Sequence, residues 1–207
     1  MSLEEFFEGM DRHLMEDERP SEYLRQVEDS ELFLHFPFEM LHRMRKTKQS
    51  PKYHPEGNVW THTLMVVDEA AKRRGESTEP RVLMWAAMLH DIGKPDTTRL
   101  KHGKITSYNH DREGERLAKE FLEIFSEDEA FIKAVCGLVR YHMQILFLSK
   151  KAELAELEEM KRQVDIREEA LLGLCDRLGR DGVDERKEKE SVREFLLACA
   201  VGEGELG

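Results

Sequence analysis

Apolar residues recur every three or four positions along most of the chain, which is the period of an amphipathic helix. The clearest case is VWTHTLMVVDEAAKRR, residues 59–74, which ends in basic residues just before Gly75, as helices commonly do. A second helix is predicted over 80–92, because Pro80 suits a first helical turn and Gly93 suits an end. The same period predicts helices over 20–33, 37–47, 113–125, 128–143, 151–163 and 166–179.

Two segments interrupt this period and suggest how the chain is organised. SPKYHPEGNVW, residues 50–60, holds two prolines and a glycine and marks a loop. We therefore expect an N-terminal helical extension over 1–50, a central domain over 51–180, and a charged C-terminal helix or tail over 181–207 packed on that domain. KHGKITSY predicts a small β-turn excursion. The predicted fold class is all-α, a helical bundle.

Composition narrows the class of protein. The chain has 207 residues, of which 40% are hydrophobic, enough for one sizeable domain. Its apolar runs are shorter than a membrane span, and the acidic start MSLEEFFEGMDRH lacks the apolar core of a secretory signal, so we expect a cytoplasmic protein without a membrane partner. Cys136, Cys175 and Cys199 lie in separate apolar helical patterns and are expected to be buried thiols.

The formal net charge of −11 argues against broad nucleic-acid binding, which depends on Lys and Arg neutralising phosphates. It leaves open a small anionic substrate held by a local cation, and a bound metal ion would supply such a charge.

Histidines and aspartates on apolar helix faces, or at helix ends, are the candidates for chemistry. Taken singly, each is more often a hydrogen-bonded core residue than a ligand. His142, however, shares a helical face with Leu138 and Val139, so it points with the core stripe. Buried ionisable groups are costly unless they are paired or coordinated, and several helices each bring one inward. The mixed nitrogen and oxygen set suits Mn, Fe, Zn, Ni or Co. The set comprises His62, His90, Asp91, His110, His142 and Asp176.

The order of these residues resembles a known family. His62, the adjacent pair His90-Asp91, and Asp176 resemble the signature of the HD superfamily of metal-dependent phosphohydrolases, and His110 and His142 resemble its two-metal version. ERPSEYLRQVEDSELFLHFPFEML, PKYHPEGNVWTHTLMVVDEAA and AAMLHDIGKPDTT also resemble the C-terminal HD region of bacterial tRNA nucleotidyltransferases, the CCA-adding enzymes. The chain shows no trace of the nucleotidyltransferase head, with its Gly-Ser motif and paired aspartates. The resemblance therefore implies phosphatase and 2′,3′-cyclic phosphodiesterase activity, not CCA addition.

The resemblance also implies roles for these residues. Asp91 would bridge two divalent ions, one held with His62, His90 and Asp176 and the other with His110 and His142. Mn, Fe, Ni, Co, Mg and Zn are the candidate ions, with one or two bound, and a metal-bound hydroxide would attack phosphorus. Lys94 follows the helix end and could be an ordinary surface lysine after a turn. From its position we expect it to hold a phosphate oxygen, because metal-bound phosphoesters need an added cation for transition-state charge.

Weaker candidates surround this set. Arg112 and Arg140 flank His110 and His142 and are candidate substrate contacts, although surface salt bridges are the commoner use of such residues. His54 belongs to the resembling loop but is expected outside the ligand set.

The expected partner is a small phosphorylated substrate, a nucleotide or an RNA end, and the sequence leaves the oligomeric state open. Two other functions stay open. One is an HD-type di-iron oxygenase, which uses a similar ligand series. The other is a tRNA- or nucleotide-binding module whose metal is structural.

Overall fold

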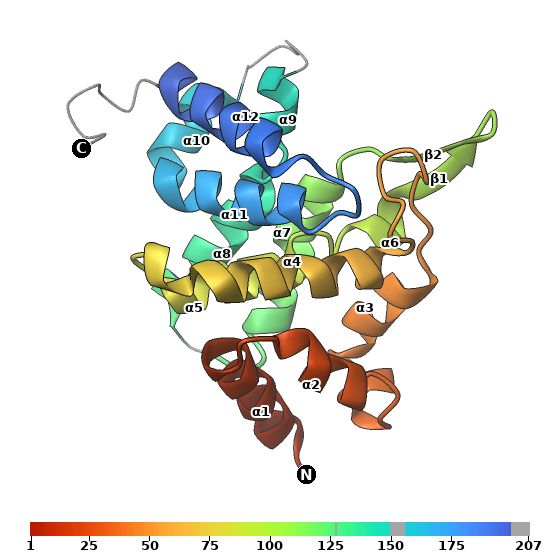
Figure 1. Cartoon of the computed structure of the whole chain (residues 1–207). Coiled ribbons are helices and arrows are strands. Elements are labelled where there is room, and N and C mark those ends of the chain that lie inside the picture. Colours follow the sequence, from red (N-terminus) through yellow and green to blue (C-terminus); the bar gives the residue numbers. More distant parts are fainter. Residues whose placement is uncertain (127, 150–155, 200–207) are drawn as a thin grey trace.

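The computed structural model describes residues 1–126, 128–149 and 156–199, and helices dominate it (Figure 1). The described α-helices are α1 (Leu3–Glu16), α2 (Pro20–Val27), α3 (Glu39–His42), α4 (Val59–Arg73), α5 (Pro80–Leu89), α6 (Lys94–Thr97), α7 (His110–Leu122), α8 (Glu129–Tyr141), α9 (Gln144–Ser149), α10 (Leu157–Gln163), α11 (Ile166–Leu178) and α12 (Glu185–Ala198). Short 3-10 helices cover Leu32–Leu34, Arg43–Lys46 and Arg74–Glu76. The predicted all-α bundle is confirmed.

Helices α4 and α5 form the centre of the bundle. Figure 1 shows them between α1 and α2 on one side and α11 and α12 on the other. The residues of α5 from Val82 to Leu89 are all buried, which explains why this segment is apolar on every face. Helix α4 begins where the Asn58 side chain accepts a hydrogen bond from the Thr61 amide at 2.9 Å. Helices α8 and α11 pack against both α5 and each other.

The N-terminal segment shares the core of the central helices. Phe6, Phe7, Met10 and Leu14 of α1 are buried in the same hydrophobic cluster as Trp85 of α5. The rings of Phe7 and Trp85 stack with their centroids 4.6 Å apart. Residues 1–50 therefore pack as part of the layer beneath α4 and α5.

The C-terminal part adds a smaller apolar cluster. Val192 and Phe195 of α12 are buried with Tyr141 and Met160. The charged run after residue 180 forms much of α12, whose polar side chains face solvent. The first residues of the helix predicted over 151–163, up to residue 155, lie outside the described residues, and α10 forms its remainder.

The small β excursion is confirmed as a hairpin of two antiparallel strands, β1 (Thr98–Lys101) and β2 (Lys104–Ser107). His102 and Gly103 form its two-residue turn with φ of 50° and 73°, the left-handed pair that matches the twist of a hairpin. Because β2 leads directly into α7, the hairpin fixes where α7 starts. Helix α7 begins at His110, three residues before the predicted start.

Segment Glu129–Ser149 is long and apolar enough by composition to cross a membrane, yet 61% of its most apolar window is buried inside the protein. It comprises α8 and α9, and α8 packs against α5, α7 and α11. This is the expected composition of a core helix.

Candidate metal centre

The centre is built around the end of α5. The helix was predicted to reach residue 92, but it ends at Leu89, and residues 90–93 form a turn that leads into α6. A methyl group on Gly93 would lie 2.2 Å from the backbone oxygen of His110 and 2.6 Å from the Gly114 amide nitrogen. Only a glycine therefore lets the first turn of α7 come this close. That approach places His110 beside Asp91.

The Asp91 carboxylate lies between two pairs of imidazoles. Its Oδ2 atom is 3.3 Å from Nε2 of His90 and 4.0 Å from Nε2 of His62. Its Oδ1 atom is 3.5 Å from Nε2 of His110 and 3.8 Å from Nε2 of His142. All five side chains are buried. Among the described residues, three groups have the close spacing of a metal site: His62, His90 and Asp91; Asp91, His110 and His142; and, in the loop before α4, His54 and Glu56 with His62.

Asp176 joins the first group from α11. Its Oδ1 atom lies 2.9 Å from Nε2 of His62, and Nη2 of Arg180 contacts its two oxygens at 2.9 and 2.8 Å. Burial alone would raise the pKa of Asp176, but the Arg180 charge and the contact with His62 hold that pKa well below its usual range. The six expected ligands thus meet in one place, with Asp176 ionised.

Each imidazole is fixed through its other ring nitrogen. In a neutral ring, an Nδ1–H group that donates to an oxygen leaves the Nε2 lone pair directed inward, which is the usual arrangement of metal-binding histidines. His62 differs, because its Nε2 atom lies 2.9 Å from Asp176 Oδ1, and although burial lowers its pKa, hydrogen bonds to Asp176 and Glu56 outweigh burial and raise that pKa. The acceptors are the Ala87 oxygen for His90 at 2.8 Å, the Ser107 oxygen for His110 at 2.6 Å, the Val139 oxygen for His142 at 2.6 Å, and Glu56 Oε1 and the Gly179 oxygen for His62 at 3.0 and 3.1 Å.

The inward nitrogens show that these residues fit a divalent ion. Burial lowers the pKa of His110, and burial with the charges of His110 and His90 lowers that of His142 to about 3. Both rings are then neutral, so two Nε2 lone pairs face each other across 3.2 Å and cannot form a hydrogen bond. Nε2 of His90 is buried without a hydrogen-bond partner among the described residues. A cation bound to these nitrogens satisfies all three, and four imidazoles with two carboxylates suit Mn, Fe, Co, Ni or Zn.

The Lys94 ammonium group contacts the Asp91 carboxylate. Its Nζ atom is 2.6 Å from Asp91 Oδ2 and 2.6 Å from Gln49 Oε1. Burial would raise the pKa of Asp91, but Lys94 and His90 outweigh this effect and hold it well below its usual range. The expected phosphate-binding ammonium group is thus beside the candidate ligands.

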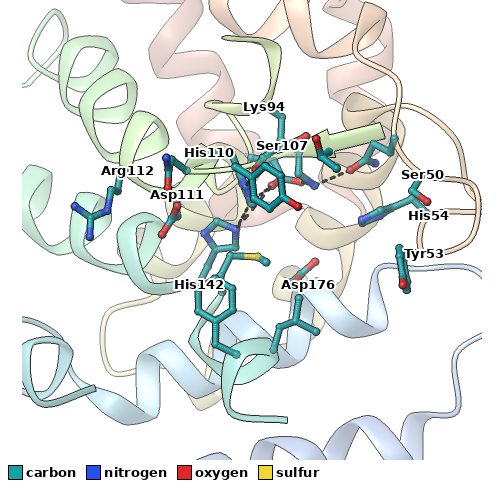
Figure 2. A pocket seen from close by; sticks show the side chains of 18 of the residues that line it. Ser50, Tyr53, His54, Lys94, Ser107, His110, Asp111, Arg112, His142 and Asp176 are labelled. Atoms are coloured by element: carbon teal, nitrogen blue, oxygen red, sulfur yellow. Dashed lines mark hydrogen bonds and ion pairs between the residues drawn. The ribbon is translucent and has the colours of Figure 1, made fainter. Parts of the chain in front are cut away.

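These groups open into a cavity of about 690 Å³, large enough for a nucleotide-sized molecule. Figure 2 shows Lys94, His110, His142 and Asp176 around one space, with Arg112 on one side and Tyr53 and His54 on the other. Of the remaining expected ligands, Asp91 lines the cavity, while His62 and His90 are not among its lining residues.

The two candidate arginines lie differently. Arg112 lines the cavity and pairs with Glu156, and its side chain is mostly exposed. Arg140 is buried and does not line the cavity, because Asp111 and Glu156 hold its guanidinium group at 2.9 and 2.7 Å. Two carboxylates thus hold Arg140 inside the wall, and its contact with substrate stays a prediction.

Sequence analysis missed Glu56, Arg180 and Gln49. Arg180 follows Asp176 by four residues, a spacing that joins side chains on one helical face and could have revealed the pair. Glu56 lies in an irregular loop, where no period indicates the direction of a side chain. It also accepts a hydrogen bond from Nδ1 of His54 at 2.9 Å, and burial lowers the pKa of His54 to about 4.

Comparison with known proteins agrees with this geometry. The family model described as HD domain matches residues 59–181. A multifunctional CCA protein from Methylococcus capsulatus is 27% identical over 184 residues, covering 87% of this chain and 36% of the relative. Another from Actinobacillus pleuropneumoniae is 29% identical over 171 residues, covering 80% and 35%. The chain thus spans about a third of the length of these relatives.

The matched segment begins at the first residue of α4, extends beyond α11, and contains all six candidate ligands. The chain therefore belongs to the HD domain family, and so to the superfamily of metal-dependent phosphohydrolases.

Proposed function

We propose that this protein is a phosphohydrolase that acts on nucleotides or on RNA-derived phosphates, including 2′,3′-cyclic phosphates. One observation carries the proposal: the Asp91 carboxylate lies between two imidazole pairs, and the Lys94 ammonium group lies 2.6 Å from that same carboxylate. Carboxylates, imidazole nitrogens and an ammonium group thus meet beside one cavity.

The chain would hold one ion through His62, His90, Asp91 and Asp176, and a second through Asp91, His110 and His142. When bound, such ions lower the pKa of water and neutralise charge on a phosphoryl group. Lys94 would bind a phosphate oxygen and stabilise negative charge that develops there during hydrolysis. The 2.6 Å contact with Asp91 supports this role, because it places the ammonium group beside the candidate ligands.

The cavity and the relatives favour the substrate class. A volume of about 690 Å³ exceeds what a phosphate group alone needs, so an organic part of nucleoside size fits beside the ligands. The relatives called multifunctional CCA proteins favour a nucleotide or an RNA end over other phosphoesters. The acidic chain favours a small substrate over a long nucleic acid, because a long polyanion needs many cations to bind.

The test is hydrolysis of bis-p-nitrophenyl phosphate, 2′,3′-cyclic AMP and a panel of nucleoside monophosphates, with added Mn²⁺, Ni²⁺, Co²⁺ or Mg²⁺. We expect turnover that requires the ion and is lost in Asp91→Asn, which keeps the shape of the side chain but removes the bridging charge. Glu113→Gln on α7 is the matched control, since its carboxylate pairs with Arg116 and lies outside the six candidate ligands. Absence of turnover by the metal-loaded wild-type protein across the whole panel would refute the proposal.

A further inference from the structure

An apolar strip lines the cavity beside the proposed ligand His142. It consists of Met143, Leu146 and Phe147, at the start of α9, and all three are only partly buried. The Phe147 amide donates a hydrogen bond to the Met143 carbonyl at 3.1 Å, so residues spaced by three and four positions lie on one helical face. Ile145, on another face, is buried in the smaller apolar cluster. The α9 strip therefore presents apolar surface to the cavity.

Tyr108 lines the same cavity from the segment between β2 and α7. It is 77% exposed, and its side chain makes no hydrogen bond, ion pair or ring contact within the described ranges 1–126, 128–149 and 156–199. Its backbone is held from both sides, because Ser107 pairs with Thr98 in the hairpin and the Ser107 carbonyl accepts a hydrogen bond from His110 at 2.6 Å. Tyr108 thus brings an uncovered aromatic ring to a fixed place on the cavity wall.

The position of Tyr108 distinguishes it from an ordinary exposed apolar residue. Such residues are common on protein surfaces and need no function. Leu100 of the same hairpin is one of them, since it is 76% exposed and does not line the cavity. Tyr108, in contrast, is two residues before His110, whose Nε2 atom lies 3.5 Å from Asp91 Oδ1, and two residues span at most about 7 Å. A group attached to a phosphate at the proposed ligands is therefore within reach of Tyr108.

A flat aromatic group is the occupant that suits this part of the cavity. Nucleobases stack on exposed aromatic side chains, and this stacking tolerates any base because every base has a π face. The α9 strip supplies further apolar surface, and apolar surface that is removed from water stabilises a complex. A phosphate group, or a ribose with its hydroxyl groups, gains much less from such surface.

Resting on the proposed function for the phosphate end, we infer that Tyr108 and the α9 strip form a nucleobase subsite, in which the base stacks on the Tyr108 ring. The phosphate would be bound at the metal centre and the base by the adjoining apolar surface. Tyr108 is then a specificity-determining residue, because it selects nucleotides over phosphoesters of the same sugar without a base.

The test compares substrates with and without a base: AMP with ribose 5-phosphate, and 2′,3′-cyclic AMP with methyl ribofuranoside 2,3-cyclic phosphate. For each pair the ratio of kcat/KM is measured with metal-loaded protein, or the ratio of inhibition constants against bis-p-nitrophenyl phosphate where neither member is turned over. Wild-type protein should favour the member with the base about tenfold in at least one pair. Tyr108→Leu keeps an apolar side chain but removes the aromatic face, and it should lower that ratio about fivefold, the lower end of the usual effect of losing a stacking residue.

Tyr108→Trp keeps an aromatic face and should retain the preference. Leu100→Ala is the matched control in the same hairpin and should leave the ratio as in wild type. An unchanged ratio in Tyr108→Leu, an equal fall in Leu100→Ala, or a wild-type ratio of one in both pairs would overturn the inference while leaving the proposed hydrolase intact. If no phosphoester is hydrolysed, the proposed function fails, and calorimetric titrations with AMP and ribose 5-phosphate then decide the base subsite separately by the same ratios of affinity.

Discussion

Replacing Glu56 with glutamine isolates the effect of one carboxylate on the metal centre. Glutamine keeps the shape of the side chain but replaces one oxygen with an amide nitrogen. Glu56 Oε1 accepts hydrogen bonds from both His54 and His62, and Oε2 is buried without a partner among the described residues. The amide oxygen can therefore occupy the Oε1 position, where it remains an acceptor but without the charge.

The magnitude follows from the second acceptor of His62. Mutation of a group that orients a metal-binding histidine typically costs 10–100-fold in affinity for the ion. Nδ1 of His62 lies 3.0 Å from Glu56 and 3.1 Å from the Gly179 oxygen, so a backbone acceptor remains in the variant. The loss should lie at the lower end, about tenfold, or about 1.4 kcal/mol of binding free energy.

The assay is a calorimetric titration of metal-free wild-type protein and Glu56→Gln with Mn²⁺ or Co²⁺. Two sites are expected, and only the one that includes His62 should weaken, because His110 and His142 are fixed by backbone oxygens elsewhere. The second site is thus an internal control for folding. Equal weakening of both sites, or no weakening of either, would refute the role assigned to Glu56.

Three further changes test other parts of the structure. Gly93→Ala should destabilise the fold by about 1–3 kcal/mol, because the new methyl group meets the backbone oxygen of His110, and metal analysis should show loss chiefly of the second ion. Lys94→Met should lower kcat about 10²-fold with no loss of bound metal, since it removes a cation from the phosphate position and not a ligand. Burial raises the pKa of Glu169 well above its usual range, so its contribution to stability is lost as pH rises through the folded-state pKa. Glu169→Gln should therefore raise Tm relative to wild type, by an amount that grows as pH rises above about 5. The control Glu168→Gln should lower Tm, because the Glu168 carboxylate accepts hydrogen bonds from the loop before α5. An unchanged Tm difference between pH 5 and 8 would contradict the assignment for Glu169.

The sequence was sufficient wherever a regular period fixed the direction of a side chain. His142 shares a face with Leu138 and Val139 in an apolar helix, and it lies in the core beside Asp91 as that face requires. The hairpin was also predictable, since a glycine in a short polar segment supports a tight turn. Helix ends were predicted less well: α5 stops three residues early because the turn over 90–93 follows contacts with α7 that lie far away in sequence.

Contacts across the fold account for the residues that were missed. The distance between Glu56 and His62 depends on how the loop 50–58 folds back over α4, and no local pattern encodes that path. Arg140, in contrast, was predicted as a site residue from its position in the sequence. Its position next to His142 suggested a substrate contact, but Asp111 and Glu156, from other segments, hold it in the wall. Charged residues near a site can be assigned only when their counter-charges are known.

Helix position explains why the His62 site needs Glu56 while the other ligands do not. The last four carbonyl groups of an α-helix have no partner within the helix. His90 and His142 directly follow α5 and α8, and each donates Nδ1–H to a carbonyl three residues earlier, so one bond both completes the helix end and fixes the ligand. His110 opens α7 and uses the Ser107 carbonyl just outside the helix in the same way. His62 lies inside α4, where the backbone carbonyls are already engaged, so its acceptors must come from elsewhere in the fold. A histidine at a helix end, such as His90, is thus oriented by the local backbone, whereas His62 depends on the loop that carries Glu56. Substitutions in that loop should therefore weaken binding of the first ion selectively.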